Sequence, residues 1–178
     1  MLRHIFLALT LATTALAALP PGRPLPDVPI SQTGGKKLDL KQYRGKALVL
    51  ALISTDCEHC DHAVDFLKIM QKESAAQGLQ VVAAAGDPDA AKAIAPFGAQ
   101  HQPNFPIAHL DKAAFLRIAN LKPDDRPFVP VILFIDAKGM VRVQLAGDDP
   151  LMDKMETVIR STIRELLKEP GITKSGKP

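Results

Sequence analysis

The sequence contains few aromatic residues and few cysteines. Its 178 residues include no tryptophan, one tyrosine and two cysteines, and its net charge is only +3. Basic residues are dispersed and form no stripe with interleaved aromatic side chains, which excludes the usual kind of nucleic-acid-binding surface. Because both cysteines lie in one short turn, a separate disulfide framework is also excluded. Hydrophobic residues make up 47% of the chain, which is enough for one domain with a sizeable core.

The amino terminus has the pattern of a secretory signal peptide. Residues 5–16 follow Arg3, are apolar apart from threonines, and end at the small-residue site Ala15-Leu16-Ala17. We therefore expect residues 1–17 to be cleaved and the protein to be periplasmic or secreted. The alternative is a membrane anchor formed by residues 5–18, but this run is shorter than the roughly 20 apolar residues that span a bilayer. No cysteine follows the run, which excludes a lipoprotein anchor.

The chain is organised around residues 47–70, which include both cysteines. The segment begins with an apolar, partly β-branched run that predicts a buried strand. A polar turn with Cys57 and Cys60 follows, and then apolar residues at helical spacing predict an amphipathic helix that ends near Gly78. Because a helix start stabilises anions, we expect the Cys57 thiolate to be the reactive group. Cys60, one turn along the helix, is placed to attack a mixed disulfide formed at Cys57.

The other segments predict further strands and helices. Short segments at 28–31 and 37–40, separated by Gly34-Gly35, indicate an N-terminal hairpin. Strands are expected at 79–85, 105–110, 130–136 and 140–146, and helices at 87–98, 111–120 and 149–169. Asp87 and Asp111 are the expected caps of the first two helices, and Gly98 is the expected end of the first. The last helix carries one apolar stripe that includes Met152 and Met155.

This order of elements predicts an α/β fold with three layers, α/β/α, around a mixed central sheet. Residues 18–30 contain five prolines and are expected to form an extended leader. Residues 31–169 would form the domain. Residues 170–178 are rich in lysine and glycine and are expected to be a disordered tail.

These features resemble the thioredoxin superfamily, and within it the extracytoplasmic TlpA/ResA-like thiol-disulfide oxidoreductases. The similarity covers residues 26–167 and rests on four features. They are Gly45-Lys46 before the first core strand, the C-x-x-C motif at 57–60, a strand–helix section inserted at 79–120, and Val129-Pro130 before a strand. The resemblance implies a thioredoxin-like sandwich with a cis Val129–Pro130 bond opposite the dithiol.

The resemblance also implies the roles of the site residues. Cys57 would be the nucleophile, Cys60 the resolving thiol, and Val129 and Pro130 the surface for an extended substrate backbone. No cofactor is expected, because electrons pass between sulfur atoms. The expected partners are protein thiols and disulfides, together with a membrane redox protein that recharges the dithiol. We expect a disulfide reductase of the cell envelope rather than an oxidase, acting in cell redox homeostasis.

Three residues of the turn are expected to tune the dithiol. Asp56 stands where the family usually has tryptophan, and its negative charge opposes thiolate formation at Cys57. Glu58 acts in the same direction and is similar to the residue of ResA-like reductases. His59 is similar to the residue of the more oxidising DsbA and disulfide isomerase motifs, and it stabilises a thiolate when protonated or by hydrogen bonding.

A copper-binding delivery module is one alternative function. Two or three residues of the cluster Cys57, His59, Cys60 and His62 could bind Cu(I), with His101 or His109 as a distant ligand. All four residues of one helical turn cannot converge on a single ion, so we assign no metal ligand. Apart from such a site, the expectation is that His62 is solvated and that His101 and His109 lie on the surface or in loops.

Two further alternatives concern the same turn. A thiol peroxidase of the AhpC/TSA type has the pattern Pro-x-x-x-Thr/Ser-x-x-Cys at its active site. Here Ser54 fits that pattern before Cys57, but Leu50 occupies the proline position. The third alternative is a binding domain that has kept the fold and lost the activity, which the replacement of the family tryptophan by Asp56 would allow.

Overall fold

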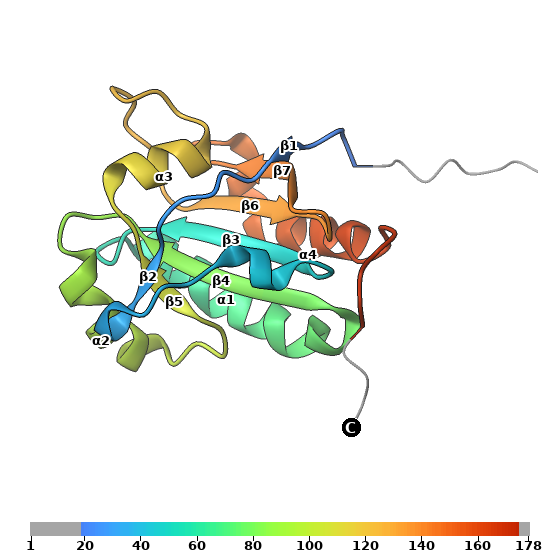
Figure 1. Ribbon diagram of the computed structural model, residues 1–178, viewed down its shortest axis with the longest axis horizontal. Coiled ribbons are helices and arrows are strands. Elements are labelled where there is room, and N and C mark those ends of the chain that lie inside the picture. The colour runs from blue at the N-terminus through green and yellow to red at the C-terminus, as the bar shows by residue number, and fades with distance from the viewer. Residues whose placement is uncertain (1–18, 175–178) are drawn as a thin grey trace, which may run out of the picture.

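Seven strands form one mixed sheet between two helical layers (Figure 1). The computed structural model describes residues 19–174 of the chain. The strands are β1 (Arg23–Pro24), β2 (Ser31–Gln32), β3 (Ala47–Ile53), β4 (Leu79–Ala85), β5 (Ile107–His109), β6 (Val131–Ile135) and β7 (Met140–Leu145). The α-helices are α1 (Glu58–Ser74), α2 (Ala90–His101), α3 (Lys112–Ala119) and α4 (Met155–Leu166). Short 3-10 helices are η1 (Thr33–Gly35), η2 (Leu40–Tyr43), η3 (Ala75–Gln77) and η4 (Pro150–Lys154).

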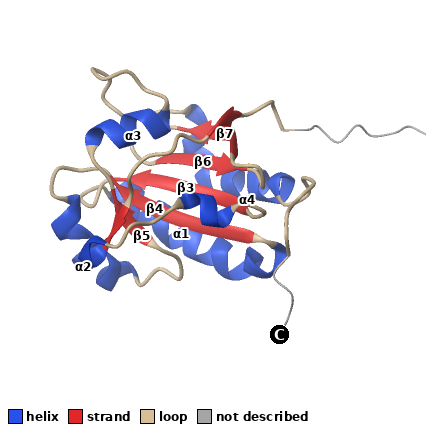
Figure 2. Cartoon of the chain, in the orientation of Figure 1, coloured by secondary structure: helices blue, strands red, loops and turns tan. Residues whose placement is uncertain are grey.

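The sheet has the strand order β1-β7-β6-β3-β4-β5-β2, with β3 at its centre. Strand β3 runs parallel to β4 and antiparallel to β6, so the sheet is mixed, as the sequence predicts. The short turn between β6 and β7 makes them an antiparallel pair. Figure 2 shows helices on both faces of this sheet, which confirms the predicted three-layer α/β fold.

Strand β3 is buried on both faces because both are covered by other elements. All seven of its residues are buried, as expected for a strand between two helical layers. Alternate residues of β3 belong to two separate core clusters, since side chains of a strand alternate in direction. One cluster contains Val49 together with residues of α1, α2 and α4, and the other contains Leu50 together with residues of α3 and Ile30.

Helix α1 is joined to the sheet by apolar contacts and by one buried amide. Its buried residues include those of the predicted apolar face, such as Val64, Leu67 and Met70. The Gln71 side chain accepts a hydrogen bond from the Val81 backbone N–H at 2.6 Å and donates one to the Leu79 carbonyl at 3.3 Å. Both polar ends of this buried amide are therefore satisfied, as burial requires.

The helix predicted at 87–98 is shifted along the chain. Helix α2 begins after Asp89 and continues through Gly98 to His101, so the prediction of its bounds and of Asp87 as its cap is wrong. The apolar stripe continues past Gly98, because Ile94, Phe97 and His101 are all buried. The helix instead ends at Gln102, which has a left-handed φ of 45°.

The last helix also differs from its prediction at one end. Asp149 accepts a hydrogen bond from the Leu151 N–H at 2.8 Å, but the turn that it caps is the 3-10 helix η4, and α4 starts only at Met155. The buried residues of α4 are Met155, Ile159, Ile163 and Leu166, which confirms the predicted apolar stripe from Met155 onward, whereas Met152 lies in η4.

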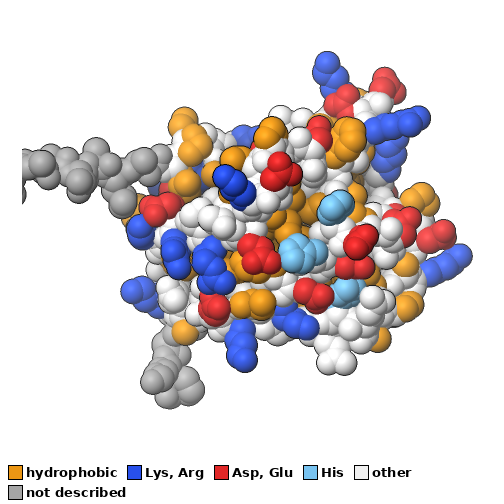
Figure 3. All heavy atoms as spheres, turned by 180° about the vertical axis from the view of Figure 1, so that it is seen from behind, with side chains coloured by type: hydrophobic (Ala, Val, Ile, Leu, Met, Phe, Trp, Pro, Cys, Tyr) orange, Lys and Arg blue, Asp and Glu red, His pale blue; other side chains and the backbone are white. Residues whose placement is uncertain are grey.

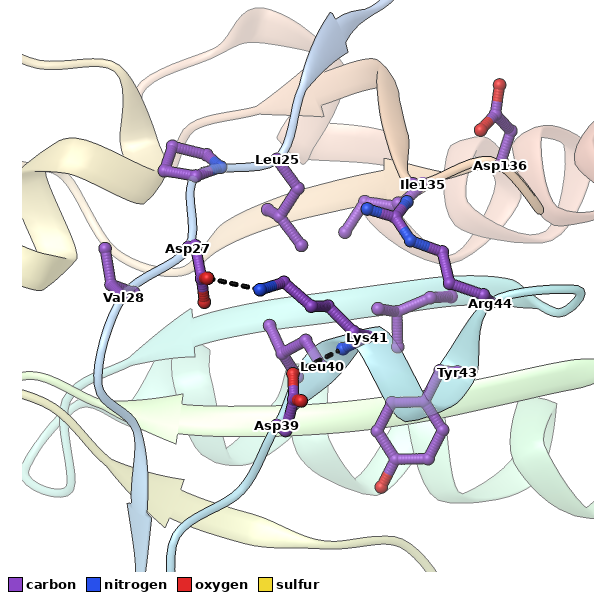
Figure 4. A pocket seen from close by; sticks show the side chains of 13 residues that line it. Leu25, Asp27, Val28, Asp39, Leu40, Lys41, Tyr43, Arg44, Ile135 and Asp136 are labelled. Atoms are coloured by element: carbon purple, nitrogen blue, oxygen red, sulfur yellow. Dashed lines mark hydrogen bonds and ion pairs between the residues drawn. The ribbon is translucent and has the colours of Figure 1, made fainter.

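The segments before β3 complete the sheet and cover its second face. Residues 31 and 37 form the antiparallel bridge of a small hairpin, and β2 also pairs with β5. Strand β1, within the proline-rich leader, pairs with β7. Figure 4 shows a pocket here, in which Asp27 of the leader forms an ion pair with Lys41 of η2 beside Leu25 and Leu40. The leader is thereby packed against the domain.

Part of the segment after the last helix is also packed against the domain. The Thr173 N–H donates a hydrogen bond to the Gly45 carbonyl at 2.6 Å, and Ile172 packs against the core cluster that contains Val49. Gly78 has a φ of 102°, and a Cβ atom there would lie 2.7 Å from Ile172. Glycine is therefore required where η3 ends, as the sequence predicts for this position.

Within residues 19–174, no helix has both the length and the apolar character needed to cross a bilayer. The predicted signal peptide, residues 1–17, and the alternative anchor, residues 5–18, lie outside the described residues.

We predict that replacing Ile163 by alanine lowers the free energy of unfolding by about 2–5 kcal/mol, because the side chain is fully buried between α4 and the sheet. The matched control is Ile69→Ala, which removes the same atoms from a residue of α1 that is 48% exposed and should change stability by about 0.5 kcal/mol or less. Denaturant unfolding of both variants measures the difference. Equal losses would contradict the assignment of the α4 stripe to the core.

Candidate functional site

Both cysteines lie where strand β3 ends and helix α1 begins. Cys57 is the N-cap residue of α1, and its sulfur accepts a hydrogen bond from the Cys60 backbone N–H at 3.2 Å. Its carbonyl accepts the N–H groups of Cys60 and Asp61 at 2.9 and 3.0 Å. A sulfur atom thus takes the position in which an oxygen usually caps a helix, next to the positive end of the helix dipole. A helix start of this kind is a position at which reactive cysteines are commonly found in proteins.

The two thiols are adjacent but differ in exposure. Their Sγ atoms lie 2.7 Å apart, and neither cysteine is in a disulfide. Cys60 is completely buried, whereas Cys57 is half-buried. Only the Cys57 sulfur is therefore open to a second molecule, while Cys60 can reach the sulfur of Cys57. The predicted roles of Cys57 as nucleophile and of Cys60 as resolving thiol would require this difference in exposure.

Burial also changes the acidity of the Cys60 thiol. Loss of solvent around the thiol raises the pKa of Cys60 far above its ordinary value of 9.0, and the hydrogen bond to Cys57 acts in the same direction. A backbone hydrogen bond from Ser54 lowers this pKa in part, while the negative charge of Asp61 raises it. Cys60 is therefore held as a neutral thiol.

A carboxylate from a neighbouring strand end fixes the loop before Cys57. Asp87 follows β4 and accepts two hydrogen bonds from Thr55, from its backbone N–H and from its hydroxyl, both at 2.9 Å. The carboxyl ends of the parallel strands β3 and β4 lie at the same edge of the sheet (Figure 1), which brings the two residues together. Sequence reasoning assigned Asp87 to a helix cap because that local pattern is common, and so missed this contact.

The turn residues expected to tune the dithiol are exposed. Asp56, Glu58 and His59 all have exposed side chains, and Asp56 accepts a hydrogen bond from the Ser54 hydroxyl. Two carboxylates therefore flank Cys57 on its solvent side. They oppose the effect of the helix dipole on a thiolate.

The segment at Val129 and Pro130 faces the dithiol. The Val129–Pro130 peptide bond is cis, which confirms the geometry that the resemblance implies. The Cys57 sulfur lies 4.0 Å from the Val129 carbonyl oxygen. Gly147 packs tightly behind this segment, because its N–H donates to the Phe128 carbonyl at 2.9 Å and a Cβ atom there would lie 2.5 Å from the Val129 oxygen.

An open groove extends from this segment along helix α4. It is lined by apolar and polar residues from the start of α1, the segment before β6, η4 and the first turn of α4: His59, His62, Pro130, Gly147, Met152, Asp153, Lys154, Met155, Glu156 and Thr157. His62 is exposed, as expected, and lies 3.2 Å from the Glu156 carboxylate. Phe128, two residues before Pro130, is 62% exposed. The dithiol thus opens beside a surface on which a polypeptide can lie.

His101 is buried, and the prediction that it lies on the surface or in a loop is wrong. Its ring packs on Phe97 with centroids 4.4 Å apart. Its Nδ1 lies 3.3 Å from an Asp65 oxygen, and its Nε2 lies 3.4 Å from an Asp61 oxygen, although the second contact lacks hydrogen-bond geometry. The ring therefore joins α2 to the two carboxylates of α1 that follow Cys60. A tertiary contact of this kind has no signal in the local sequence.

Within residues 19–174, no group of three or more His, Cys, Asp or Glu side chains has the arrangement needed to hold a metal ion. His59 and His62 line the groove, whereas the ring of His101 lies between Asp61 and Asp65.

We predict that Asp87→Ala lowers the free energy of unfolding by about 1–3 kcal/mol, because the Thr55 N–H and hydroxyl lose their partner. Amide hydrogen exchange at Thr55 should become faster than the global change in stability accounts for. Asp89→Ala is the matched control, since the Asp89 side chain makes no capping hydrogen bond. If the two variants behave alike, Asp87 does not hold the loop.

We also predict an alkaline loss of stability that depends on Cys60. The folded-state pKa of Cys60 is raised, so its contribution is fully present below the ordinary value of 9.0 and is lost as the pH rises above it. Under reducing conditions, the original protein should lose more stability than Cys60→Ala between about pH 9 and pH 11. Denaturant unfolding across this range measures both slopes. Parallel slopes would show that the thiol is not shifted.

Comparison with known proteins places this geometry in a family. Residues 21–144 match the AhpC/TSA family. The thiol-disulfide oxidoreductase ResA of Bacillus thuringiensis is 24% identical over 128 residues, which are 71% of this chain and 70% of that protein. Among solved structures, a thiol:disulfide interchange protein of the thioredoxin family from Chlorobium tepidum has a TM-score of 0.65 at 17% identity, covering 82% of this chain and 97% of that one. A thioredoxin-like protein from Porphyromonas gingivalis has the same TM-score at 18% identity, covering 82% and 93%. The chain therefore belongs to the AhpC/TSA family, and its fold is that of thioredoxin-like proteins.

Proposed function

We propose that the protein is a thiol-disulfide oxidoreductase whose reactive group is the Cys57–Cys60 dithiol. The observation that carries the proposal is the placement of the Cys57 sulfur at the start of α1, 2.7 Å from a buried second sulfur. A disulfide with a purely structural role would close a loop too short to constrain the unfolded chain much. The similarity to ResA supports the same activity.

The proposed reaction is a two-electron exchange between sulfur atoms. The Cys57 thiolate attacks a substrate disulfide, a mixed disulfide forms, and one substrate sulfur leaves as a thiolate that takes up a proton. Cys60 then gives up its proton, and its sulfur attacks Cys57 and releases the second substrate sulfur. The substrate gains two electrons and the protein is left with a Cys57–Cys60 disulfide. No cofactor is needed for either step.

The surroundings of the dithiol support particular roles for its neighbours. Val129 and Pro130 would receive the extended backbone of the substrate, since the Val129 carbonyl oxygen lies 4.0 Å from the Cys57 sulfur. His59 would stabilise the thiolate, and the exposed carboxylates Asp56 and Glu58 would oppose it. The raised pKa of Cys60 keeps this thiol neutral, so it would retain its proton until it attacks the mixed disulfide. We propose disulfide reduction rather than oxidation as the direction of the reaction.

The proposed location is the cell envelope, with the protein periplasmic or secreted after cleavage of residues 1–17. The substrates would be protein thiols and disulfides. A dithiol that reduces them in an oxidising compartment must be reduced again after each turnover, and the proposed source of electrons is a membrane redox protein.

Thiol peroxidase activity is a second candidate because the family match is to AhpC/TSA. The peroxidase pattern needs proline at the position of Leu50, and Leu50 is fully buried within β3. The proline of the peroxidase pattern is therefore replaced here by a buried strand residue. Consumption of hydrogen peroxide by the reduced protein, measured beside disulfide exchange, decides between the two activities.

We predict that Cys57→Ser abolishes reduction of a model protein disulfide, because only the Cys57 sulfur is open to a second molecule. Cys60→Ser should instead accumulate a covalent complex with the substrate, since the sulfur that resolves it is missing. Non-reducing electrophoresis of the two variants with an oxidised substrate measures both outcomes.

The double variant Cys57→Ser/Cys60→Ser is the control for complexes that form without a thiol. If Cys60→Ser captures no substrate under any redox condition, or if Cys57→Ser retains exchange activity, the proposed function is refuted.

A further inference from the structure

We propose that the substrates of this site carry lysine or arginine next to the cysteine that reacts with Cys57. The inference deepens the proposed function, on which it rests. The occupant of the groove along α4 would be an extended segment of a partner protein with a positively charged side chain beside its disulfide.

The first observation is the charge around the dithiol. The chain as a whole has 22 basic and 19 acidic residues and is positively charged. In contrast, three carboxylates flank the cysteines, at Asp56, Glu58 and Asp61, while Asp153 and Glu156 line the groove. Lys154 is the one lysine or arginine among the groove-lining residues. The surface around the reactive sulfur is therefore opposite in sign to the chain.

The space-filling view supports this separation of charge. Figure 3 shows the face that carries α1 and α4, where histidine side chains lie among acidic ones and hydrophobic atoms are visible between them. Most lysine and arginine side chains on this face lie away from the histidines. Of the two carboxylates of the groove, that of Glu156 lies 3.2 Å from the His62 Nε2.

The second observation is that the groove can receive a polypeptide. Pro130, Gly147, Met152 and Met155 contribute apolar atoms to its lining, and the side chain of Phe128, two residues before Pro130, is exposed. Leu151, next to Met152, is 49% exposed. Apolar side chains that remain exposed beside a groove are typical of a surface that binds a partner.

Together the two observations determine the chemistry of the occupant. A segment that places its cysteine at Cys57 meets the exposed carboxylates of Asp56 and Glu58 beside that residue, and where it continues into the groove it meets those of Asp153 and Glu156. Negative side chains in that segment would be repelled, whereas lysine or arginine would be attracted. Such complementarity acts mainly on the rate of association and weakens with salt.

Two disulfide-linked peptides, identical except for lysine or glutamate on both sides of the cysteine, test the proposal. The rate of reduction by the reduced protein is measured for each peptide at low salt and at about 1 M salt. We expect the lysine peptide to react about tenfold faster at low salt. The ratio of rates should approach one at high salt, where the Debye length is only about 3 Å.

Two variants of α4 provide the matched comparison. Glu156→Lys removes a carboxylate from the groove together with its contact to His62. Glu165→Lys makes the same charge change at the other end of the helix, where Glu165 pairs with Lys168. The preference for the lysine peptide should fall at least about threefold in Glu156→Lys and remain unchanged in Glu165→Lys.

Equal rates for the two peptides at low salt, or an equal loss of preference in both variants, would overturn this inference and leave the proposed function intact. Absence of reaction with either peptide would instead refute the proposed function, and this inference with it. The peptide pair therefore distinguishes the two failures.

Discussion

The site depends on the way in which one buried strand leads into one helix. Strand β3 is covered on both faces, so its position and register are fixed by the two core clusters. The start of α1 is fixed in turn, because the helix packs on the same sheet through a continuous apolar face and through Gln71. The Cys57 sulfur can act as the cap of the helix only because the strand before it delivers it to that point. The position of the Cys57 sulfur is thus a consequence of packing in the core.

The turn also carries groups whose effects oppose one another. The helix dipole and the Cys60 N–H stabilise negative charge on the Cys57 sulfur, whereas Asp56 and Glu58 disfavour it. These carboxylates do not promote formation of a thiolate, so they would have another role, in the binding of a partner. Selection of positively charged partners is a role that the groove along α4 supports, since its carboxylates have the same sign. The site would then exchange some reactivity of the thiol for selectivity.

The sequence predicted the parts of the fold that follow from local patterns. The bounds of β3, β4 and β7, the apolar stripe of α4 and the cap at Asp111 depend on neighbours in the chain, and the structure confirms them, the strand bounds to within one residue. The cis bond before Pro130 was predictable from the resemblance of its surroundings to a known family.

The misplaced features depend on contacts between distant residues. Asp87 binds Thr55, 32 residues earlier, and His101 lies between two carboxylates that precede it by at least 36 residues. Local rules treated Asp87 as a cap and Gly98 as a stop, whereas the buried positions at Phe97 and His101 extend α2 past the glycine. The groove was not predictable either, because it joins residues of α1, η4 and the segment before β6.

The unequal exposure of the two sulfur atoms has a consequence for how electrons would flow. Because Cys60 is fully enclosed, any donor and any acceptor must both use Cys57, and they cannot be engaged together. Turnover would alternate between two half-reactions at the Cys57 sulfur and would show ping-pong kinetics. A donor in excess would then compete with the acceptor for the same sulfur, so the abundance of each partner, as well as its affinity, would control the flux.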